Sequence, residues 1–198
     1  MPHSEKRILR FDRHGWLHAG SGVSLEPSPN FDARPDGQDA FLLVLHNISL
    51  PPGQFGGPEV VDFFLNRLDY SAHPWLDRLR DIRVSAHFFI RRDGHIVQFV
   101  STHVRAWHAG VSIFEERERC NDFSIGIELE GTDTLPYADT QYATLQRLLP
   151  ALRVRHPLRA VRGHEHIAPL RKTDPGPAFD WARFARESHF QRRQLPPF

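Results

Sequence analysis

Hydrophobic runs bounded by turn residues divide the first half of the chain into recognisable elements. The apolar run of residues 41–45 predicts a buried strand over residues 41–46, which ends at His46. Residues 84–90 and 96–100 are largely apolar, and they flank the sequence Arg92-Asp93-Gly94-His95. Because Asp-Gly favours a tight two-residue turn, we expect these two segments to pair as an antiparallel hairpin.

The second half of the chain continues with alternating and helical patterns. Residues 123–130 alternate in part and predict another strand of the sheet, with Gly126, Glu128 and Glu130 on one face. An amphipathic helix is predicted over residues 137–154, entered through Ala138-Asp139-Thr140. Its apolar stripe consists of Tyr142, Leu145, Leu148, Leu149 and Leu152. A short strand over residues 160–163 and a last helix over 180–187 complete the series.

Gly- and Pro-rich segments separate these elements. Residues 1–40 show no sustained period, so we expect them to wrap the domain surface, and residues 185–198 read as a C-terminal tail. Residues 50–58 form a loop in which Pro58 is placed to open a helix that runs through Leu68. Strands interleaved with helices predict a single α/β domain over 1–198 with a central mixed β-sheet flanked by helices, since the hairpin disfavours a purely parallel sheet.

Composition narrows the classes of function. The 198 residues carry 25 basic and 24 acidic side chains, a formal net charge of +1, so we expect neither a nucleic-acid nor a membrane partner. The single cysteine, Cys120, excludes an intrachain disulfide and fits a reducing compartment. Residues 1–10 lack the apolar stretch of a secretory signal, and no run of 18 apolar residues occurs. These observations predict a cytoplasmic location.

Candidate metal ligands lie at the ends of predicted strands. His164 and Asp174 lie ten residues apart in one loop, and His46 ends the strand over 41–46. Imidazole nitrogen and carboxylate oxygen both bind zinc, and a catalytic zinc keeps three protein ligands. His46 could equally be a hydrogen-bonded core histidine, and Asp174 could open an Asp-Pro-Gly turn. His166 is an alternative to His164, but in an extended segment it would point to the opposite face.

Two further residues suggest hydrolytic chemistry. Glu128, if it points into a cleft, can accept a proton from a water that a zinc ion has acidified. The alternative is a solvated carboxylate on a half-exposed antiparallel strand. Lys172 can stabilise the oxyanion that forms when water attacks a carbonyl, although a solvated loop lysine is the commoner case. The neighbouring Arg171 is assigned no role.

Several segments, taken together, resemble a known enzyme family. These segments are residues 44–53, 83–87, 105–110, 120–133 and 171–176. They resemble the zinc-dependent N-acetylmuramoyl-L-alanine amidases of cytoplasmic cell-wall recycling, a family similar to phage lysozyme-type amidases and peptidoglycan recognition proteins. The resemblance runs from about residue 15 to residue 184. It implies a peptidoglycan-recognition-protein or amidase-like fold, one zinc ion held by His46, His164 and Asp174, Glu128 as the base that activates water, and Lys172 polarising the substrate carbonyl.

The resemblance also implies substrate contacts. Arg83 and Arg119 would hold the carboxylates of the stem peptide, Trp107 would line the cleft, and Asn47 would contact substrate beside His46. The alternatives are a core aromatic for Trp107 and solvated charges for the arginines. His87 is expected to be structural or to support the metal site indirectly.

Two positions depart from the family pattern. Trp75 follows His73-Pro74, where relatives often carry a tyrosine, so a phenol is replaced by an indole that can only donate a hydrogen bond. Glu165 and His166 also stand beside His164, where smaller or neutral residues are common.

The resemblance thus implies a zinc amidase that cleaves the bond between (1,6-anhydro-)N-acetylmuramic acid and L-alanine. Its partner would be a small muropeptide, and we expect a monomer. Two alternatives remain at this point: a non-catalytic muropeptide-binding module, and a periplasmic amidase that acts on intact peptidoglycan.

Overall fold

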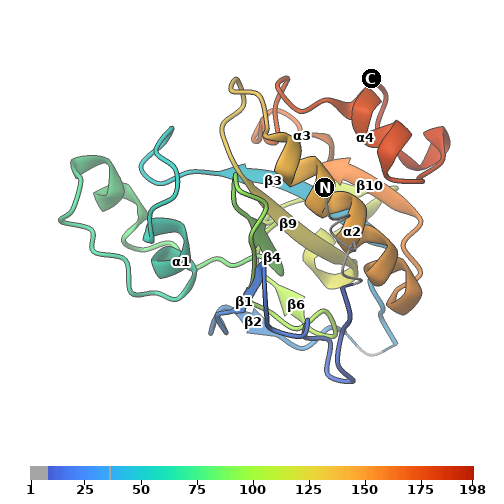
Figure 1. The fold of residues 1–198 in the computed structure, drawn as a ribbon, viewed down its shortest axis with the longest axis horizontal. Helices are drawn as coiled ribbons and strands as arrows, with labels where there is room; N and C mark the ends of the chain where they lie inside the picture. The colour runs from blue at the N-terminus through green and yellow to red at the C-terminus, as the bar shows by residue number, and fades with distance from the viewer. Residues whose placement is uncertain (1–8, 36) are drawn as a thin grey trace, which may run out of the picture.

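A six-stranded mixed sheet forms the centre of the protein (Figure 1). The computed structural model describes residues 9–35 and 37–198. In spatial order the strands are β1 (Val23–Leu25), β5 (Ile96–Gln98), β4 (Phe88–Ile90), β9 (Ser124–Glu130), β3 (Leu42–Ile48) and β10 (Ala160–Gly163). Strands β4 and β5 pair antiparallel, whereas the other neighbours in this sheet pair parallel. The mixed sheet and its hairpin are therefore confirmed.

Alternation along the central strands separates a packing face from a second face. The side chains of Leu43 and Leu45 on β3, and of Ile125 and Ile127 on β9, belong to one core cluster with Leu148 of helix α2 (Asp139–Arg155). This helix crosses the sheet in front of β3 and β9 (Figure 1). Since successive strand residues point to opposite faces, the even-numbered residues of β3 and β9 are left for the other side. That side carries the candidate chemistry.

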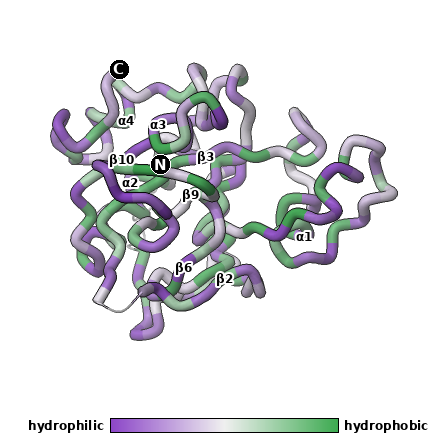
Figure 2. The backbone as a smooth tube through the Cα atoms, turned by 180° about the vertical axis from the view of Figure 1, so that it is seen from behind, coloured by the Kyte–Doolittle hydropathy of each residue, from purple (hydrophilic) through white to green (hydrophobic). Residues whose placement is uncertain are grey.

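The segment after β3 forms an arm beside the sheet. Helix α1 (Glu59–Phe64) and the 3-10 turn η1 (Pro74–Leu79) lie together to one side of the sheet in both Figures 1 and 2. Phe63 and Phe64 pack with Phe89 and Phe99 in a second core cluster, which fixes the arm to β4 and the segment after β5. Helix α1 ends four residues before the expected Leu68.

The early end of α1 has a local cause. Asn66 adopts a left-handed conformation with φ of 59°, which an α-helix cannot continue through. The backbone N–H of Arg67 then donates to the carbonyl of Asp62. The apolar residues after Phe64 belong to the same core cluster, so their pattern is that of packed loop and not of helix.

Short elements complete the described chain. They are β2 (Phe31–Asp32) paired with β6 (Arg105–Ala106), β7 (Ile113–Phe114) paired with β8 (Arg117–Glu118), η2 (Cys120–Phe123), α3 (His164–Ile167), α4 (Trp181–Glu187) and η3 (Arg192–Gln194). Asp180 caps α4 by accepting a hydrogen bond from the N–H of Arg183, so the last predicted helix is confirmed. No helix in the described part of the chain combines the length and apolar character that a membrane-spanning segment needs.

Four further predicted elements differ in extent from the observed ones. The strands expected over 84–90 and 96–100 shorten to β4 and β5, and the strand expected to end at residue 46 continues to Ile48. The segment 1–40, expected to be irregular, contributes β1 to the central sheet and β2 to a small one; residues 1–8 and 36 of it lie outside the described residues. Strand β9 is buried along its whole length between parallel neighbours, so the half-exposed antiparallel alternative for it was wrong.

Candidate functional site

The candidate site lies where three parallel strands end. His46 near the end of β3 is in register with Glu128 of β9, and Gly163, the last residue of β10, is in register with Leu45. His164 directly follows β10 and begins α3. Because parallel strands bring their carboxyl ends to one edge of a sheet, residues far apart in sequence meet there. Asp174 is brought to the same edge because its carbonyl accepts a hydrogen bond from the N–H of Glu165 in α3.

Three potential ligand atoms converge at this edge. The Nδ1 atoms of His46 and His164 lie 3.0 Å apart, and Asp174 Oδ2 lies 2.9 Å from the first and 3.1 Å from the second. Donors on a tetrahedral zinc ion with bonds of about 2.0–2.1 Å are separated by about 3.3 Å. The three atoms thus form a nearly equilateral triangle of the size that such an ion requires, and their chemistry matches a zinc site.

The opposite nitrogens of both histidines are occupied. His164 Nε2 lies 3.1 Å from the carbonyl oxygen of Ala109, which only accepts, so this nitrogen carries the proton. His46 Nε2 lies 2.9 Å from Nδ1 of His108. With protons on the two Nε2 atoms, both Nδ1 lone pairs face the point where the three donors converge. Metal-binding histidines are typically held in this way by their second nitrogen.

The protonation states also suit a cation site. Burial, reinforced by the nearby His164, lowers the pKa of His46 to about 4, so its imidazole is neutral near pH 7. Burial opposes ionisation of Asp174, but its close contacts with the rings of His164 and His46 outweigh burial and lower the pKa of the carboxyl group. Neutral imidazole and ionised carboxylate are the forms that bind metal ions.

Glu128 lies in the same cavity with an unmet hydrogen bond. Its side chain is 9% exposed, and the buried Oε2 atom has no hydrogen-bond partner in the structure. Burial, followed by the negative charge of Asp174, raises the pKa of Glu128 well above its ordinary value, while the positive charge of Lys172 acts in the opposite direction. A buried carboxyl group that lacks a partner and is easily protonated is suited to proton transfer.

The cavity around these groups has a polar floor and an apolar wall. Its volume is about 570 Å³. His46, Glu128 and Asp174 lie at the polar end, and the exposed Lys172 lines the same space. The arm contributes the apolar wall, with Phe63, Phe64, Trp75, Leu79, Ile82 and Val84. A cavity of this size can enclose a small ligand with both sugar-like and peptide-like parts.

Asn47 and Trp107 occupy different places. Asn47 lines the cavity, and its Nδ2 donates to Asp133 Oδ1 and to the carbonyl of Pro175, so it also ties two loops to β3. Trp107 is half-buried and hydrogen-bonds Asp32 through its side chain; it is not among the residues that line this cavity.

The two candidate arginines lie outside the cavity lining. Arg83 is exposed, and its Nη1 donates to the carbonyls of Arg80 and Ile82. Arg119 is exposed as well, and its Nε lies 3.5 Å from Asp122 Oδ2. The structure therefore brings the metal candidates, Glu128, Lys172 and Asn47 into one cavity, but it does not bring Arg83, Arg119 or Trp107 into that lining.

Two other histidines are engaged elsewhere. His87 is fully buried; its Nδ1 accepts from the N–H of Gly126, and its Nε2 donates to the carbonyl of Val104. His166 accepts from the N–H of Gly163 through Nδ1. Residues 164–167 form a helical turn, so the argument that applied to an extended segment does not apply at His166, and the group of converging ligand atoms contains His164 and not His166.

His108 was not singled out from the sequence. This residue is buried, lines the cavity, and links His46 to Ser124 Oγ through its two ring nitrogens. It lies within the resemblance segment 105–110, but no spacing rule distinguishes it among thirteen histidines. Only the folded contact with His46 reveals it.

Comparison with known proteins places the chain in a family. Residues 40–177 match the family model described as N-acetylmuramoyl-L-alanine amidase. The 1,6-anhydro-N-acetylmuramyl-L-alanine amidase AmpD of Citrobacter freundii is 58% identical over 172 residues, which cover 86% of this chain and 90% of that protein.

Solved structures agree with this match. The crystal structure of a selenomethionine AmpD derivative superposes with a TM-score of 0.83 at 56% identity, covering 87% of this chain and 96% of that one. The amidase AmiD of Escherichia coli, solved in complex with anhydro-N-acetylmuramic acid-L-Ala-D-γ-Glu-L-Lys, superposes with a TM-score of 0.57 at 27% identity, covering 80% of this chain and 62% of that one. The expected amidase-like fold is confirmed, and the chain belongs to the N-acetylmuramoyl-L-alanine amidase family.

Proposed function

We propose that this protein is a zinc-dependent amidase that hydrolyses the amide between the lactyl group of 1,6-anhydro-N-acetylmuramic acid and L-alanine, in cytoplasmic peptidoglycan recycling. One observation carries the proposal: three metal-binding atoms converge beside a buried glutamate whose Oε2 has no partner, inside a single cavity. The relatives support the substrate class, since AmpD is named for the anhydro-muramyl amide and AmiD was solved with an anhydro-muramyl peptide.

Each proposed role follows from chemistry at a stated atom. One zinc ion per chain, held by His46, His164 and Asp174, would supply Lewis acidity that acidifies water and polarises a carbonyl. Glu128 would take the proton from the attacking water and pass it to the leaving nitrogen of L-alanine. The ammonium group of Lys172 would stabilise the negative charge that develops on the amide oxygen. No covalent bond to the protein forms in this scheme.

Substrate binding is proposed to use both ends of the cavity. Asn47 lies beside His46 and is a candidate contact to the reacting part of the substrate. Arg83 and Arg119 are exposed, so their guanidinium groups can turn towards stem-peptide carboxylates, and Trp107 would flank the entrance. We propose that the protein acts as a monomer on a small muropeptide.

Zinc content and cleavage test the proposal together. The purified protein should contain about one zinc per chain, release the stem peptide from an anhydro-muropeptide, and lose this activity with a chelator, regaining it with added zinc. Mass spectrometry of the products locates the cleaved bond. A protein that binds the muropeptide but never cleaves it would be a binding module, and the amidase proposal would be withdrawn.

A second substrate tests the cellular role. Intact sacculi offer the same amide within a cross-linked wall, so release of peptide from them can be compared with release from the soluble anhydro-muropeptide. We expect a strong preference for the soluble substrate. Preference for sacculi would support a wall-lytic amidase and overturn the recycling assignment.

A further inference from the structure

The outer nitrogens of both candidate zinc histidines end on one dipeptide. His46 Nε2 lies 2.9 Å from His108 Nδ1, and His164 Nε2 lies 3.1 Å from the carbonyl oxygen of Ala109. His46 on β3 and His164 at the start of α3 are 118 residues apart in sequence, yet two adjacent residues contact both rings on the side away from the cluster. The dipeptide His108-Ala109 can therefore set the orientation of both rings at once.

The backbone of this dipeptide is itself fixed. The Oδ1 atom of Asn121 accepts from the N–H of His108 at 3.2 Å and from the N–H of Ala109 at 2.8 Å. The guanidinium group of Arg171 donates to the carbonyl of Ala109 at 3.0 Å, on the same oxygen that faces His164. A residue to which the sequence assigned no role thus holds the loop carrying Asp174 against the acceptor for His164.

Strand β9 leaves space for the ring of His108 at Gly126. A Cβ atom at Gly126 would come within 2.5 Å of His108 Cγ, so only glycine leaves room for the imidazole there. Two residues earlier on the same face, Ser124 Oγ lies 3.1 Å from His108 Nε2. The ring is buried between β9 and His46, with one polar contact at each nitrogen.

We propose that His108-Ala109 is a positioning element that orients both zinc histidines. In this arrangement the Nε2–H group of His46 donates a hydrogen bond to Nδ1 of His108. This inference rests on the proposed zinc site and extends it. In this tautomer His108 Nε2 donates to Ser124, and His46 presents only its Nδ1 lone pair to the metal. An acceptor behind a histidine ligand fixes its tautomer and raises its basicity, and loss of such an acceptor costs about 10–100-fold in metal affinity or activity.

Two substitutions at one position separate this role from simple packing. In His108→Asn, the amide oxygen can take the place of Nδ1 and still accept from His46. In His108→Gln, the amide group can take the place of Nε2, which keeps the contact to Ser124 but leaves His46 without its acceptor. Both variants replace the imidazole ring by a less bulky amide side chain. A loss of packing alone would therefore lower the zinc affinity of the two variants by similar amounts.

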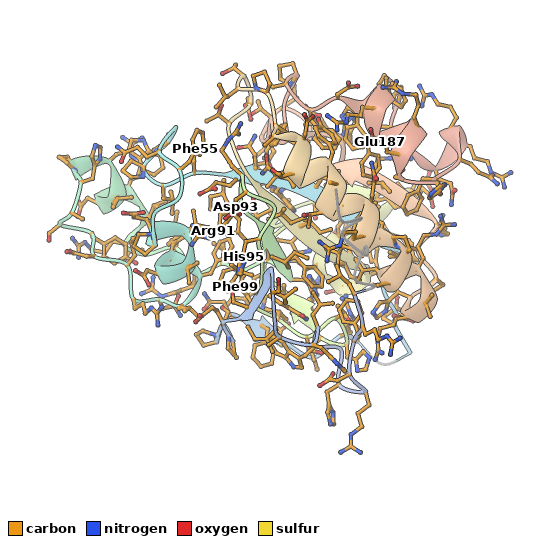
Figure 3. All side chains as sticks on the ribbon, viewed as in Figure 1. Phe55, Arg91, Asp93, His95, Phe99 and Glu187 are labelled. Atoms are coloured by element: carbon orange, nitrogen blue, oxygen red, sulfur yellow. The ribbon has the colours of Figure 1, made fainter. Side chains whose placement is uncertain are left out.

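A matched control comes from the hairpin. His95 Nε2 lies 3.0 Å from Ser24 Oγ, and His108 Nε2 lies 3.1 Å from Ser124 Oγ. His95 lies between β4 and β5, where Figure 3 labels it, and it does not line the cavity that holds the candidate metal ligands. His95→Asn removes a serine-bonded histidine without touching a zinc ligand.

The experiment measures zinc affinity by competition with a chromophoric chelator, together with the visible absorption of the cobalt-substituted protein. We expect His108→Gln to weaken zinc binding by about 10–100-fold and to change the cobalt spectrum, whereas His108→Asn recovers most of that affinity and His95→Asn binds like the wild type. Circular dichroism and thermal melting show whether each variant is folded.

Three results would overturn the inference. Wild-type affinity in folded His108→Gln would show that the contact does not support the metal. Equal losses in the Asn and Gln variants would assign the effect to packing. If the wild-type protein does not bind stoichiometric zinc, the proposed function fails, and the inference fails with it. If the wild type binds zinc and both His108 variants bind zinc as tightly as the wild type, only the inference is refuted.

Discussion

Two positions on strand β9 carry buried carboxylates that differ in their hydrogen bonding. Glu130, 3% exposed, accepts hydrogen bonds from the N–H of Gly56 through Oε1 and from the N–H of Arg92 through Oε2. The Oε2 atom of Glu128, two residues earlier on the same face, has no hydrogen-bond partner among the described residues. Both side chains are buried on one strand, so neither residue type nor burial distinguishes them.

The difference lies in what the fold supplies to each carboxylate. The oxygens of Glu130 join the loop before α1 to the β4–β5 hairpin, and Arg91, labelled in Figure 3 at that hairpin, lies 3.9 Å from Oε1. Glu128 instead faces the cavity that holds the candidate metal ligands. A buried polar group without a protein partner is costly, and a carboxyl group of this kind beside candidate metal ligands marks a candidate functional group.

Glu128→Gln tests the functional side of this comparison and should have the largest effect. The amide cannot take up the proton of the attacking water, so we expect kcat to fall by about 10²–10⁴-fold. Zinc content should remain at the wild-type level, because Glu128 is not one of the three converging ligands. Anhydro-muropeptide cleavage and metal analysis on the same preparation measure both. If activity stays near wild type, the role of general base must be withdrawn.

Glu130→Gln is the matched substitution on the structural side. Glutamine keeps one acceptor oxygen but turns an NH₂ group towards the second backbone N–H, which loses its partner. We expect the free energy of unfolding to fall by about 1–3 kcal/mol, with kcat little changed at a temperature where the variant is folded. Urea unfolding and steady-state kinetics separate the two quantities. A kcat loss that matches Glu128→Gln would mean that both carboxylates belong to the reaction.

The sequence predicts the elements that have a long and regular pattern. Helix α2 and strand β9 were found because their apolar residues repeat over several turns or pleats, and the hairpin was found from Asp93-Gly94. Strand β1 has three residues, too few for a period, and its place in the sheet depends on pairing with β5. Pairing between distant segments is a tertiary property that local pattern does not contain.

The candidate site shows the same division. His46, His164 and Asp174 were found because each lies at the end of a strand or in a turn with ligand chemistry. The sequence could not predict that Glu130 has hydrogen-bond donors whereas Glu128 Oε2 has none among the described residues. The donors to Glu130, Gly56 and Arg92, lie in loops far from it in sequence. His108 was missed for the same reason.

His87 extends the comparison to a buried histidine whose bonds are met, like those of Glu130. Burial, followed by the charge of Arg34, lowers the pKa of His87 well below its ordinary value; His108 is also nearby, with 5.9 Å between ring centroids. A folded-state pKa below the unfolded value of about 6.5 means that His87 favours folding fully above that pH and that this contribution is lost as pH falls.

His87→Asn should therefore flatten the acid side of the stability profile. Its amide oxygen can still accept from Gly126, but the group cannot titrate. Between pH 5 and 6, just below the unfolded pKa of about 6.5, we expect the slope of unfolding free energy against pH to fall, by at most about 1.4 kcal/mol per unit, the limit for one proton. Urea unfolding at a series of pH values measures this slope. Identical slopes in variant and wild type would contradict the sign and the origin of the effect.

Trp75→Tyr should give the smallest change, because Trp75 belongs to the wall that Glu128 faces and not to its chemistry. The indole is half-buried in the arm, with the Arg78 guanidinium carbon 5.0 Å from its ring centroid, and it lines the cavity beside apolar residues. Replacement by the smaller phenol removes apolar contact area from the cavity wall, so we expect KM to rise by less than about tenfold with kcat unchanged. Steady-state kinetics on the anhydro-muropeptide separate the two constants. A rise in kcat would show that a hydroxyl at this position reaches the reacting amide. The apolar wall of the cavity would then take part in the chemistry as well as in binding.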